Sequence, residues 1–510
     1  MGPVVGVAIA AAHPAETERQ DVNRSSGTET TRSIAESAAQ KGLDPAERPD
    51  GAARNGLRAL GVYGLRLFGA ALAFGSQIAL ARWLSAAEYG IYASIFVGLM
   101  LLGGWLSLGL GAAMIRFVPE YKALGRLDLL RGLRRTSFGV ALGVSGLIAC
   151  LALVLVSADV SPVSAGYRGV LFYAALMLPF LALTEINDGY CRGQGLPIRA
   201  MAPSMLLRPL LLLTGIGIGI ALFSAQPMAE NAMVAMLVAV AITAVVQMAI
   251  AMRSQVVPDT AQVAATGTTP APPRYDFRLW FDVSLPLVLV EGLLQLMNNV
   301  DVLLVGALLT PADVGHYYAA TRILTLVGFV PVAVIAVTAP SFAHFSAKDD
   351  TANLSRSVNQ AMALSFWPAL AIALAMILVG PLLLAAFGAT FTDAYGALLI
   401  LMIAAVARAA LAPAQTMLVM TGHHRAGMAI LGGAVVVNAG LNLLMIPAFG
   451  ITGAAIATAL AVLMEIAVSA HVIRRRFGFN PMPSIHLGDL RRLLRSRLGG
   501  ERWASTLEEV

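Results

Sequence analysis

Residues 84–92 read LSAAEYGIY, and residues 309–317 read LTPADVGHY. The two stretches share a leucine, a hydroxyl residue, an alanine, an acid, a glycine and a final tyrosine, and they lie 225 positions apart, from Leu84 to Leu309. Similarity over such a distance indicates a duplicated structural unit. The spacing therefore predicts that the chain is built from two related halves.

The composition places both halves in a membrane. Hydrophobic residues make up 58% of the chain and charged residues 13%, with a mean hydropathy of +0.75, against about 45–50% apolar and 25% charged residues in soluble domains. A bilayer core about 30 Å thick takes about 20 apolar residues per helix, and such stretches recur along the chain. We therefore expect an all-α polytopic membrane protein.

Turn residues and charges divide the apolar sequence into twelve expected helices. Their spans are Gly61–Leu84, Tyr89–Phe117, Thr136–Val156, Gly169–Tyr190, Ala200–Phe223, Ala232–Met252, Phe281–Leu309, Gly315–Ala343, Val358–Ala386, Ala394–Met420, Gly427–Ile446 and Ile451–Ile473. The repeated loops join helices one and two and helices seven and eight. Because six is an even number, both loops fall on the same membrane face, which predicts two parallel six-helix lobes around a central cavity.

The regions outside the helices complete the expected domain organisation. We expect a disordered cytoplasmic tail, an N-lobe, a cytoplasmic linker rich in Pro, Thr and Ala, a C-lobe and a basic amphipathic tail on the membrane surface. These regions are residues 1–58, 59–253, 254–277, 278–474 and 475–510, respectively. In the repeated loops the glycine and the acid are expected to shape a tight turn.

Basic residues predict the orientation, because Arg and Lys gather in short cytoplasmic loops. With the N-terminus inside, the inner loops carry Lys122, Arg126, Arg131, Arg134, Arg135, Arg192, Arg199, Arg253, Arg274, Arg278, Lys348, Arg356 and Arg425. The outer loops carry only Arg82 and Arg168. Both termini are therefore expected in the cytoplasm. The same rule explains the net charge of +6 without a nucleic-acid partner.

Polar residues within the spans are the candidate functional residues, since a charge at the centre of a spanning helix costs about 2.5–3.5 kcal/mol and usually faces a cavity or a partner. In helix seven, Glu291, Gln295 and Asn298 follow the spacing of one helical face, flanked by Asn299 and Asp301. This pattern indicates a water-accessible lining with a role in cavity formation or ion coupling. The alternative is a buried polar seam that joins helices.

Two charges near the second repeated loop are expected at matching depths. Asp301 lies shortly before the end of helix seven, and Arg322 lies a similar distance into helix eight. An antiparallel hairpin would bring them close enough for an ion pair, which lowers the cost of burying either charge. A purely structural pair and a transport role both fit.

Further arginines predict an anion-binding cavity. Arg408 lies near the middle of helix ten, whereas Arg66 and Arg208 lie toward the inner ends of helices one and five. Facing the cavity, these residues would suit a phosphate or diphosphate group; the alternative for Arg66 and Arg208 is snorkelling to the interface. Glu465 in helix twelve is a counter-charge or a cation-coupling group. Neither a zinc-type His/Cys cluster nor a GxxxxGK[ST] loop is present, so no cofactor or metal is expected.

Three stretches carry a resemblance to a known family: LARWLSAAEYGIYASI, SLGLGAAMIRFVPEY and NNVDVLLVGALLTPADVGHYYAATRI. They resemble the polysaccharide transport family, the O-antigen and exopolysaccharide repeat-unit flippases of the multidrug/oligosaccharidyl-lipid/polysaccharide exporter superfamily. The resemblance covers about Gly61 to Ile473.

The resemblance implies a non-enzymatic, multi-pass protein of the bacterial inner membrane. Such proteins move undecaprenyl-diphosphate-linked oligosaccharides between the leaflets by alternating access, in lipopolysaccharide or exopolysaccharide biosynthesis. Arg66, Arg322 and Arg408 are the positions that match the family's cationic cavity. The implied partners are the lipid-linked oligosaccharide and membrane lipids, together with a polysaccharide polymerase and a chain-length regulator.

Other functions fit the sequence less well or share the fold. A cation-coupled multidrug antiporter of the same superfamily would have the same fold and would favour acids in the cavity. A major-facilitator exporter would carry a G-x-L-x-D-R-x-G-R-R signature, which GRLDLLRGLRR at 125–135 does not match. A membrane glycosyltransferase would need larger extramembrane regions with an acid/base constellation.

Overall fold

The computed structural model describes residues 49–158, 165–222, 227–254 and 272–483, and these residues form helices and loops without a strand. Within these residues, eleven helical stretches are long and apolar enough to cross a membrane. The last stretch, Arg425–Phe477, is two helices joined at Gly450, whose φ of 59° and ψ of −140° lie outside the helical region. The predicted all-α membrane fold with about twelve spanning helices is confirmed.

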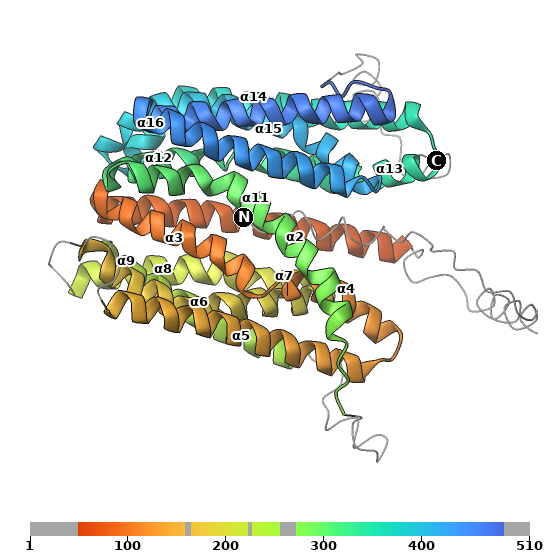
Figure 1. Cartoon of the computed structure of the whole chain (residues 1–510), viewed down its shortest axis with the longest axis horizontal. Helices are drawn as coiled ribbons and strands as arrows, with labels where there is room; N and C mark the ends of the chain where they lie inside the picture. Colours follow the sequence, from red (N-terminus) through yellow and green to blue (C-terminus); the bar gives the residue numbers. More distant parts are fainter. Residues whose placement is uncertain (1–48, 159–164, 223–226, 255–271, 484–510) are drawn as a thin grey trace, which may run out of the picture.

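The helices form two lobes that lie as two layers in Figure 1. The N-lobe contains α2 (Pro49–Trp83), α3 (Ala86–Leu106), α4 (Leu110–Ala123), α5 (Leu127–Ser157), α6 (Ala165–Gly193), α7 (Pro197–Ala202), the π-helix η2 (Pro203–Leu207), α8 (Arg208–Leu222) and α9 (Ala229–Arg253). The C-lobe contains α11 (Phe277–Leu308), α12 (Pro311–Leu324), α13 (Phe329–Ala347), α14 (Thr351–Phe387), the 3-10 helix η3 (Ala389–Ala394), α15 (Tyr395–Met420) and α16 (His424–Phe477).

Several helices are longer than the apolar spans predicted for them. Helix α2 begins at Pro49, so residues 49–58, which we expected to be disordered, are helical. Extending an existing helix is easier than nucleating one, so this stretch is helical although it contains two glycines, which disfavour helix. Residues 1–48, most of the expected linker and the expected amphipathic tail lie outside the described residues.

Three predicted helices are interrupted. The second is divided into α3 and α4, the eighth into α12 and α13, and the fifth into α7, η2 and α8. Between α3 and α4 the backbone takes positive φ at Leu108 (47°) and Gly109 (74°). A methyl group on Gly109 would lie 2.3 Å from the carbonyl oxygen of Ser284 in α11. The break therefore lets α11 pass close to the N-lobe backbone.

The two repeated hairpins meet at one end of the molecule, which we call the hairpin end, where α3 and α12 lie side by side (Figure 1). A methyl group on Gly90 would lie 1.7 Å from the carbonyl oxygen of Pro311. Conversely, a methyl group on Gly315 would lie 2.3 Å from the carbonyl oxygen of Ala86. Equivalent residues of the two repeats thus make reciprocal contacts, as expected across a two-fold axis.

The expected role of these glycines in a tight turn is wrong, because Gly90 and Gly315 lie inside α3 and α12. The acids instead belong to helix caps. The hydroxyl of Ser85 accepts a hydrogen bond from the backbone N–H of Glu88 at 3.2 Å, and Thr310 forms a capping box with Asp313 in the second repeat.

Aromatic side chains fill the contact between the lobes around the glycines. The ring of Tyr89 from the N-lobe lies 5.7 Å from that of Tyr318 and 5.9 Å from that of Phe391. Nearby, the rings of Phe74 and Phe387 are 5.7 Å apart. Tyr89, Tyr318 and Phe387 are almost fully buried, so the lobes are tightly packed at the hairpin end.

Replacing Gly90 by alanine is expected to lower the thermal stability of the purified protein, because the added methyl group overlaps backbone atoms that cannot rotate away. Overpacking of this kind typically costs about 1–3 kcal/mol. A methyl group on Gly98 in the same helix would have no neighbouring atom within 4 Å, so Gly98→Ala is the matched control and should be neutral or stabilising. Unfolding midpoints that fall equally for both variants would contradict the reciprocal contact.

Candidate functional site

The polar stripe of helix seven lies on α11, which contacts helices of both lobes. Near the start of α11, the indole Nε1 of Trp280 donates a hydrogen bond to the hydroxyl of Tyr121 in α4 at 2.9 Å. Farther along, Gln295 Nε2 donates to Glu291 Oε1 at 3.4 Å, which confirms that these side chains share a face. Asn298 is exposed, and the other two are partly exposed.

Asn298 connects the stripe to the C-lobe arginine. Arg408 Nη1 donates to Asn298 Oδ1 at 2.8 Å, and Arg408 Nη2 lies 3.6 Å from Glu465 Oε2. Gln415 Nε2 donates to Glu465 Oε1 at 2.5 Å. Since Arg408 remains about one-third exposed while contacting α11, it faces the interior of the protein and not the lipid. The expected counter-charge role of Glu465 agrees with this geometry.

Asp301 lies in a separate, buried polar cluster. Its side chain is 4% exposed. Tyr317 donates its hydroxyl proton to Asp301 Oδ2 at 2.7 Å, and Thr458 does so at 3.4 Å. These partners are neutral, so the site holds a carboxylate with no cationic side chain in contact within the described part of the chain.

The expected Asp301–Arg322 ion pair does not form. The guanidinium of Arg322 lies over the ring of Tyr318, 4.3 Å from its centroid, in a cation–π contact. Asp301 instead contacts Tyr317, and five residues along an α-helix turn the side chain about 140° away. The depths of the two charges were matched, but their helical faces were not.

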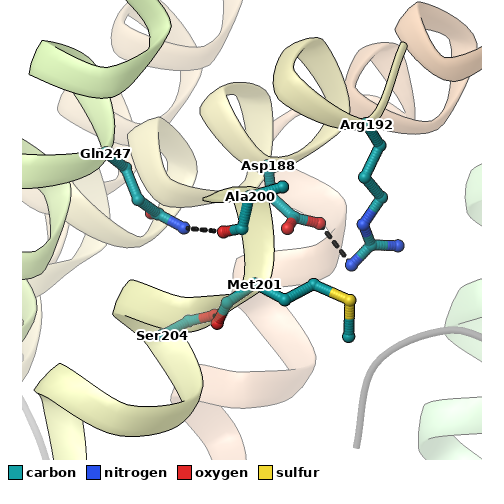
Figure 2. Close-up of polar contacts among 6 residues, drawn as sticks. All are labelled: Asp188, Arg192, Ala200, Met201, Ser204 and Gln247. Atoms are coloured by element: carbon teal, nitrogen blue, oxygen red, sulfur yellow. Dashed lines mark hydrogen bonds and ion pairs between the residues drawn. The ribbon is translucent and has the colours of Figure 1, made fainter. Parts of the chain in front are cut away.

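Arg66 and Arg208 lie beside acidic residues of the N-lobe. Arg208 is within electrostatic range of Glu185 and Asp188, and Asp188 is also within range of Arg66. Asp188 forms an ion pair with Arg192 (Figure 2). Arg66 and Arg208 are both partly buried, and acidic side chains lie within electrostatic range of each. This group of charges is therefore mixed and not purely cationic.

The position of Arg208 depends on the π-helix that precedes it. Pro203 opens η2 and lacks the N–H that would continue an α-helical ladder. Side chains support the distorted turn: Gln247 of α9 donates to the carbonyl of Ala200 at 2.9 Å, and Ser204 donates to the carbonyl of Met201 at 3.0 Å (Figure 2). Single turns of π-helix often occur at functional sites.

Glu291 links the N-lobe cluster to α11, because it lies within electrostatic range of Glu185. The stripe thus begins beside the N-lobe charges at Glu291 and ends beside the C-lobe arginine at Asn298. This arrangement brings the charged groups of the two lobes to opposite ends of one polar helix face.

A cavity of about 580 Å³ lies elsewhere, at the hairpin end between α2, α14 and η3. Its lining includes Arg82, Ser85, Phe387 and Phe391, and none of the predicted site residues. Arg82 Nε donates to the carbonyl of Ala386 at 2.6 Å. The Arg82 side chain therefore already makes a hydrogen bond between the N-lobe and the C-lobe. We therefore place the candidate site at the polar clusters and not at this groove.

Asp301 and Arg322 have no charged counterparts in the first repeat. At the 225-residue spacing, Ser76 corresponds to Asp301 and Val97 corresponds to Arg322. Ser76 donates its hydroxyl proton to the carbonyl of Ala73 at 2.7 Å, which is a local helix contact. The duplication therefore repeats the fold but not the chemistry.

Three residues of the clusters around Asp301 and Arg408 were not predicted. Gln415 lies seven residues after Arg408 and so on the same helix face, a spacing that the sequence displays. Tyr317 closes the repeated loop, but nothing in the pattern shows that its hydroxyl reaches Asp301. Thr458 is distant in sequence and becomes a neighbour only through packing of α16 on α11.

Comparison with protein families gives two matches. The family described as Polysaccharide biosynthesis protein matches residues 62–346, and the family described as MatE matches residues 286–444. No curated protein has a sequence that matches this chain.

Solved structures share the fold at low sequence identity. An inward-facing multidrug resistance MATE family transporter of the MOP superfamily has a TM-score of 0.66 at 17% identity, covering 80% of this chain and 94% of its own. The lipid II flippase MurJ, in an inward closed conformation, has a TM-score of 0.60 at 12% identity, covering 86% and 93%. A MOP superfamily transporter from Pyrococcus furiosus, described as having a binding pocket of reversed polarity, has a TM-score of 0.57 at 16% identity, covering 82% and 95%.

Tyr317→Phe is expected to lower the free energy of unfolding by about 2 kcal/mol, because hydrogen bonds to charged groups contribute about 1.5–3 kcal/mol. Tyr318→Phe is the matched control, since its hydroxyl makes no hydrogen bond to any described residue. In a double-mutant cycle, Asp301→Asn should lower the free energy of unfolding by less in the Tyr317→Phe background than in the wild type. Additive unfolding midpoints would contradict the Tyr317–Asp301 contact.

Proposed function

Because the chain belongs to the polysaccharide biosynthesis protein family, within the MOP superfamily of transporters, we propose that it is a flippase for lipid-linked oligosaccharides. The proposed substrate is an undecaprenyl-diphosphate-linked polysaccharide repeat unit, moved across the bacterial inner membrane. The family match spans more than half of the chain, and the shared fold with the lipid II flippase MurJ supports a lipid-linked substrate.

The position and contacts of Arg408 are the main support for this function. Its guanidinium lies in the middle of α15, about one-third exposed, between the polar stripe of α11 and the carboxylate of Glu465. A planar guanidinium with open N–H groups is suited to a diphosphate, which it binds through two parallel hydrogen bonds. A sugar or an organic cation would not require this charge.

Arg322 and the N-lobe arginines extend the proposed binding path. Arg322 is partly buried, and its Nε makes no hydrogen bond to any described residue. Arg66 and Arg208 offer further positive charge beside Glu185 and Asp188. An anionic headgroup moving past α11 would meet these arginines in turn, while its lipid tail stays in the bilayer.

The proposed transport mechanism is alternating access, in which the lobes rock about the space between them. The lobes are packed together at the hairpin end, which the charge pattern predicts to be periplasmic. On that orientation, the two lobes are in contact at the periplasmic end in this structure. Release would require the glycine contacts between α3 and α12 to separate.

Asp301 is the proposed ion-coupling group. It is a buried carboxylate with neutral hydroxyl partners, so a proton or a monovalent cation would balance its charge. Glu465, by contrast, already has Arg408 as its partner.

A cation-coupled multidrug antiporter is the second candidate. Glu185 and Glu291 lie within electrostatic range of each other, which favours this candidate because neighbouring carboxylates attract cations. A polysaccharide polymerase and a chain-length regulator are proposed partners only for the flippase.

Arg408→Ala and Arg322→Ala are each expected to abolish polysaccharide export, because each removes a charge that binds the diphosphate. A deletion strain should accumulate lipid-linked repeat units, and the wild-type gene should clear them. The matched control is Arg278→Ala, since Arg278 is 94% exposed and its ion contact with Asp282 is weak.

Membrane levels of each variant are measured alongside export. Full export by both variants would exclude the arginines from substrate binding. Normal polysaccharide with altered drug sensitivity in the deletion strain would support the antiporter instead.

Asp301→Asn is expected to lower export at least about tenfold while the protein remains folded, because the amide cannot carry the coupling charge; a factor of ten corresponds to about 1.4 kcal/mol. Ser76→Ala, at the equivalent position of the first repeat, is the control and should leave export unchanged. Equal export by the wild type and Asp301→Asn would assign coupling to another group.

A further inference from the structure

Arg408 contacts two partners of different kinds. One is the neutral Asn298, which accepts a hydrogen bond of 2.8 Å. The other is the carboxylate of Glu465, whose Oε2 is 3.6 Å from Arg408 Nη2. A charge-assisted N–H···O bond measures about 2.7–2.9 Å, so the ionic contact is looser than the neutral one.

The two members of this pair differ sharply in burial. The side chain of Glu465 is 2% exposed, whereas that of Arg408 is 32% exposed. Glu465 Oε1 accepts a hydrogen bond from Gln415, but Oε2 accepts none from the described residues. Gln415 therefore holds Oε1 of Glu465, and Oε2 faces Arg408. About one-third of the Arg408 side chain remains exposed.

An alternating-access transporter must reorient both with and without its substrate. An unpaired charge in the membrane interior is costly, and removing one member of a buried pair is strongly destabilising. With an anionic substrate bound, the phosphate oxygens satisfy Arg408. Without substrate, the protein itself must supply an anion.

We infer that Glu465 is an internal counter-anion that takes the place of the substrate's phosphate on Arg408 in the empty protein. This inference rests on the proposed flippase function. Gln415 holds the carboxylate in position, and the long ionic contact lets the phosphate displace it. Glu465 is thus a positioning residue that sets both the affinity for the anion and the rate of return of the empty protein.

Loss of the counter-anion should change the affinity for the diphosphate and the transport rate in opposite directions. Removing the negative charge of Glu465 removes the competitor, so an added diphosphate binds more tightly. The same change leaves Arg408 unpaired when the substrate leaves, so the empty protein returns slowly. A residue with a merely structural role would weaken binding and slow transport together.

The test uses the full-length protein in lipid nanodiscs, with farnesyl diphosphate as the binding probe. Glu465→Gln is expected to bind the probe about tenfold more tightly than the wild type, a change of about 1.4 kcal/mol. In proteoliposomes with a fluorescent polyprenyl diphosphate, the variant should show a lower half-saturating concentration and a lower maximal rate. Size-exclusion chromatography verifies that it is folded.

Glu465→Asp is the second variant, because it keeps the charge and shortens the side chain by one methylene. Its affinity for the probe should lie between those of the wild type and Glu465→Gln, and it should keep most of the transport. Arg408→Ala should not bind the probe.

The outcomes separate the inference from the function on which it rests. If the wild type binds the probe and Arg408→Ala does not, but neither Glu465 variant binds more tightly than the wild type, the counter-anion role is overturned and the flippase proposal stands. If the wild type does not bind the probe at all, both the counter-anion role and the flippase proposal are overturned. The expected order of affinities, with the opposed change in maximal rate, supports both.

Discussion

The contact of Gly90 with Pro311, and its mirror contact of Gly315 with Ala86, sets how closely the two lobes approach. Backbone atoms meet there at distances that admit no Cβ, so α3 and α12 can cross only where both carry glycine. The aromatic rings of Tyr89 and Tyr318 then pack around the crossing. Because this contact lies at one end of the helices, it holds the lobes together there in this structure, and the polar groups of α11 lie farther along the chain from it.

Helix α11 contacts both lobes. Its first turns are tied to the N-lobe through Trp280 and Tyr121, whereas its later turns pack on α16 of the C-lobe. A helix anchored to both lobes presents its polar face between them. The stripe therefore spans from Glu291, beside the N-lobe charges, to Asn298, beside Arg408. Reorientation of the lobes must strain or bend this helix, and Pro286 within it lacks the N–H of a continuous ladder.

The architecture could be predicted because hydropathy identifies each membrane helix from its own segment. The spacing of the repeated loop in turn indicates the duplication. The fold class, the approximate helix number and the shared face of Glu291 and Gln295 were predicted in this way. The side-chain partners were not, because they depend on the rotation of each helix about its axis. Asp301 and Arg322 have matched depths, yet Tyr317 occupies the face toward Asp301. The π-helix before Arg208 likewise requires support from Gln247 in a distant helix.

The duplicated fold makes the unequal charges informative. Each charge within the membrane costs about 2.5–3.5 kcal/mol on insertion scales, and the first repeat avoids that cost with Ser76 and Val97 where the second has Asp301 and Arg322. Within the described part of the chain, Asp301 is contacted by hydroxyl groups and a backbone N–H and Arg322 lies over an aromatic ring, so neither has an oppositely charged side chain in contact. Arg408 and Glu465 together are neutral until an outside anion separates them. Stability of the fold therefore does not require charges at the positions of Asp301 and Arg322, since its own first half has an uncharged serine and a valine there.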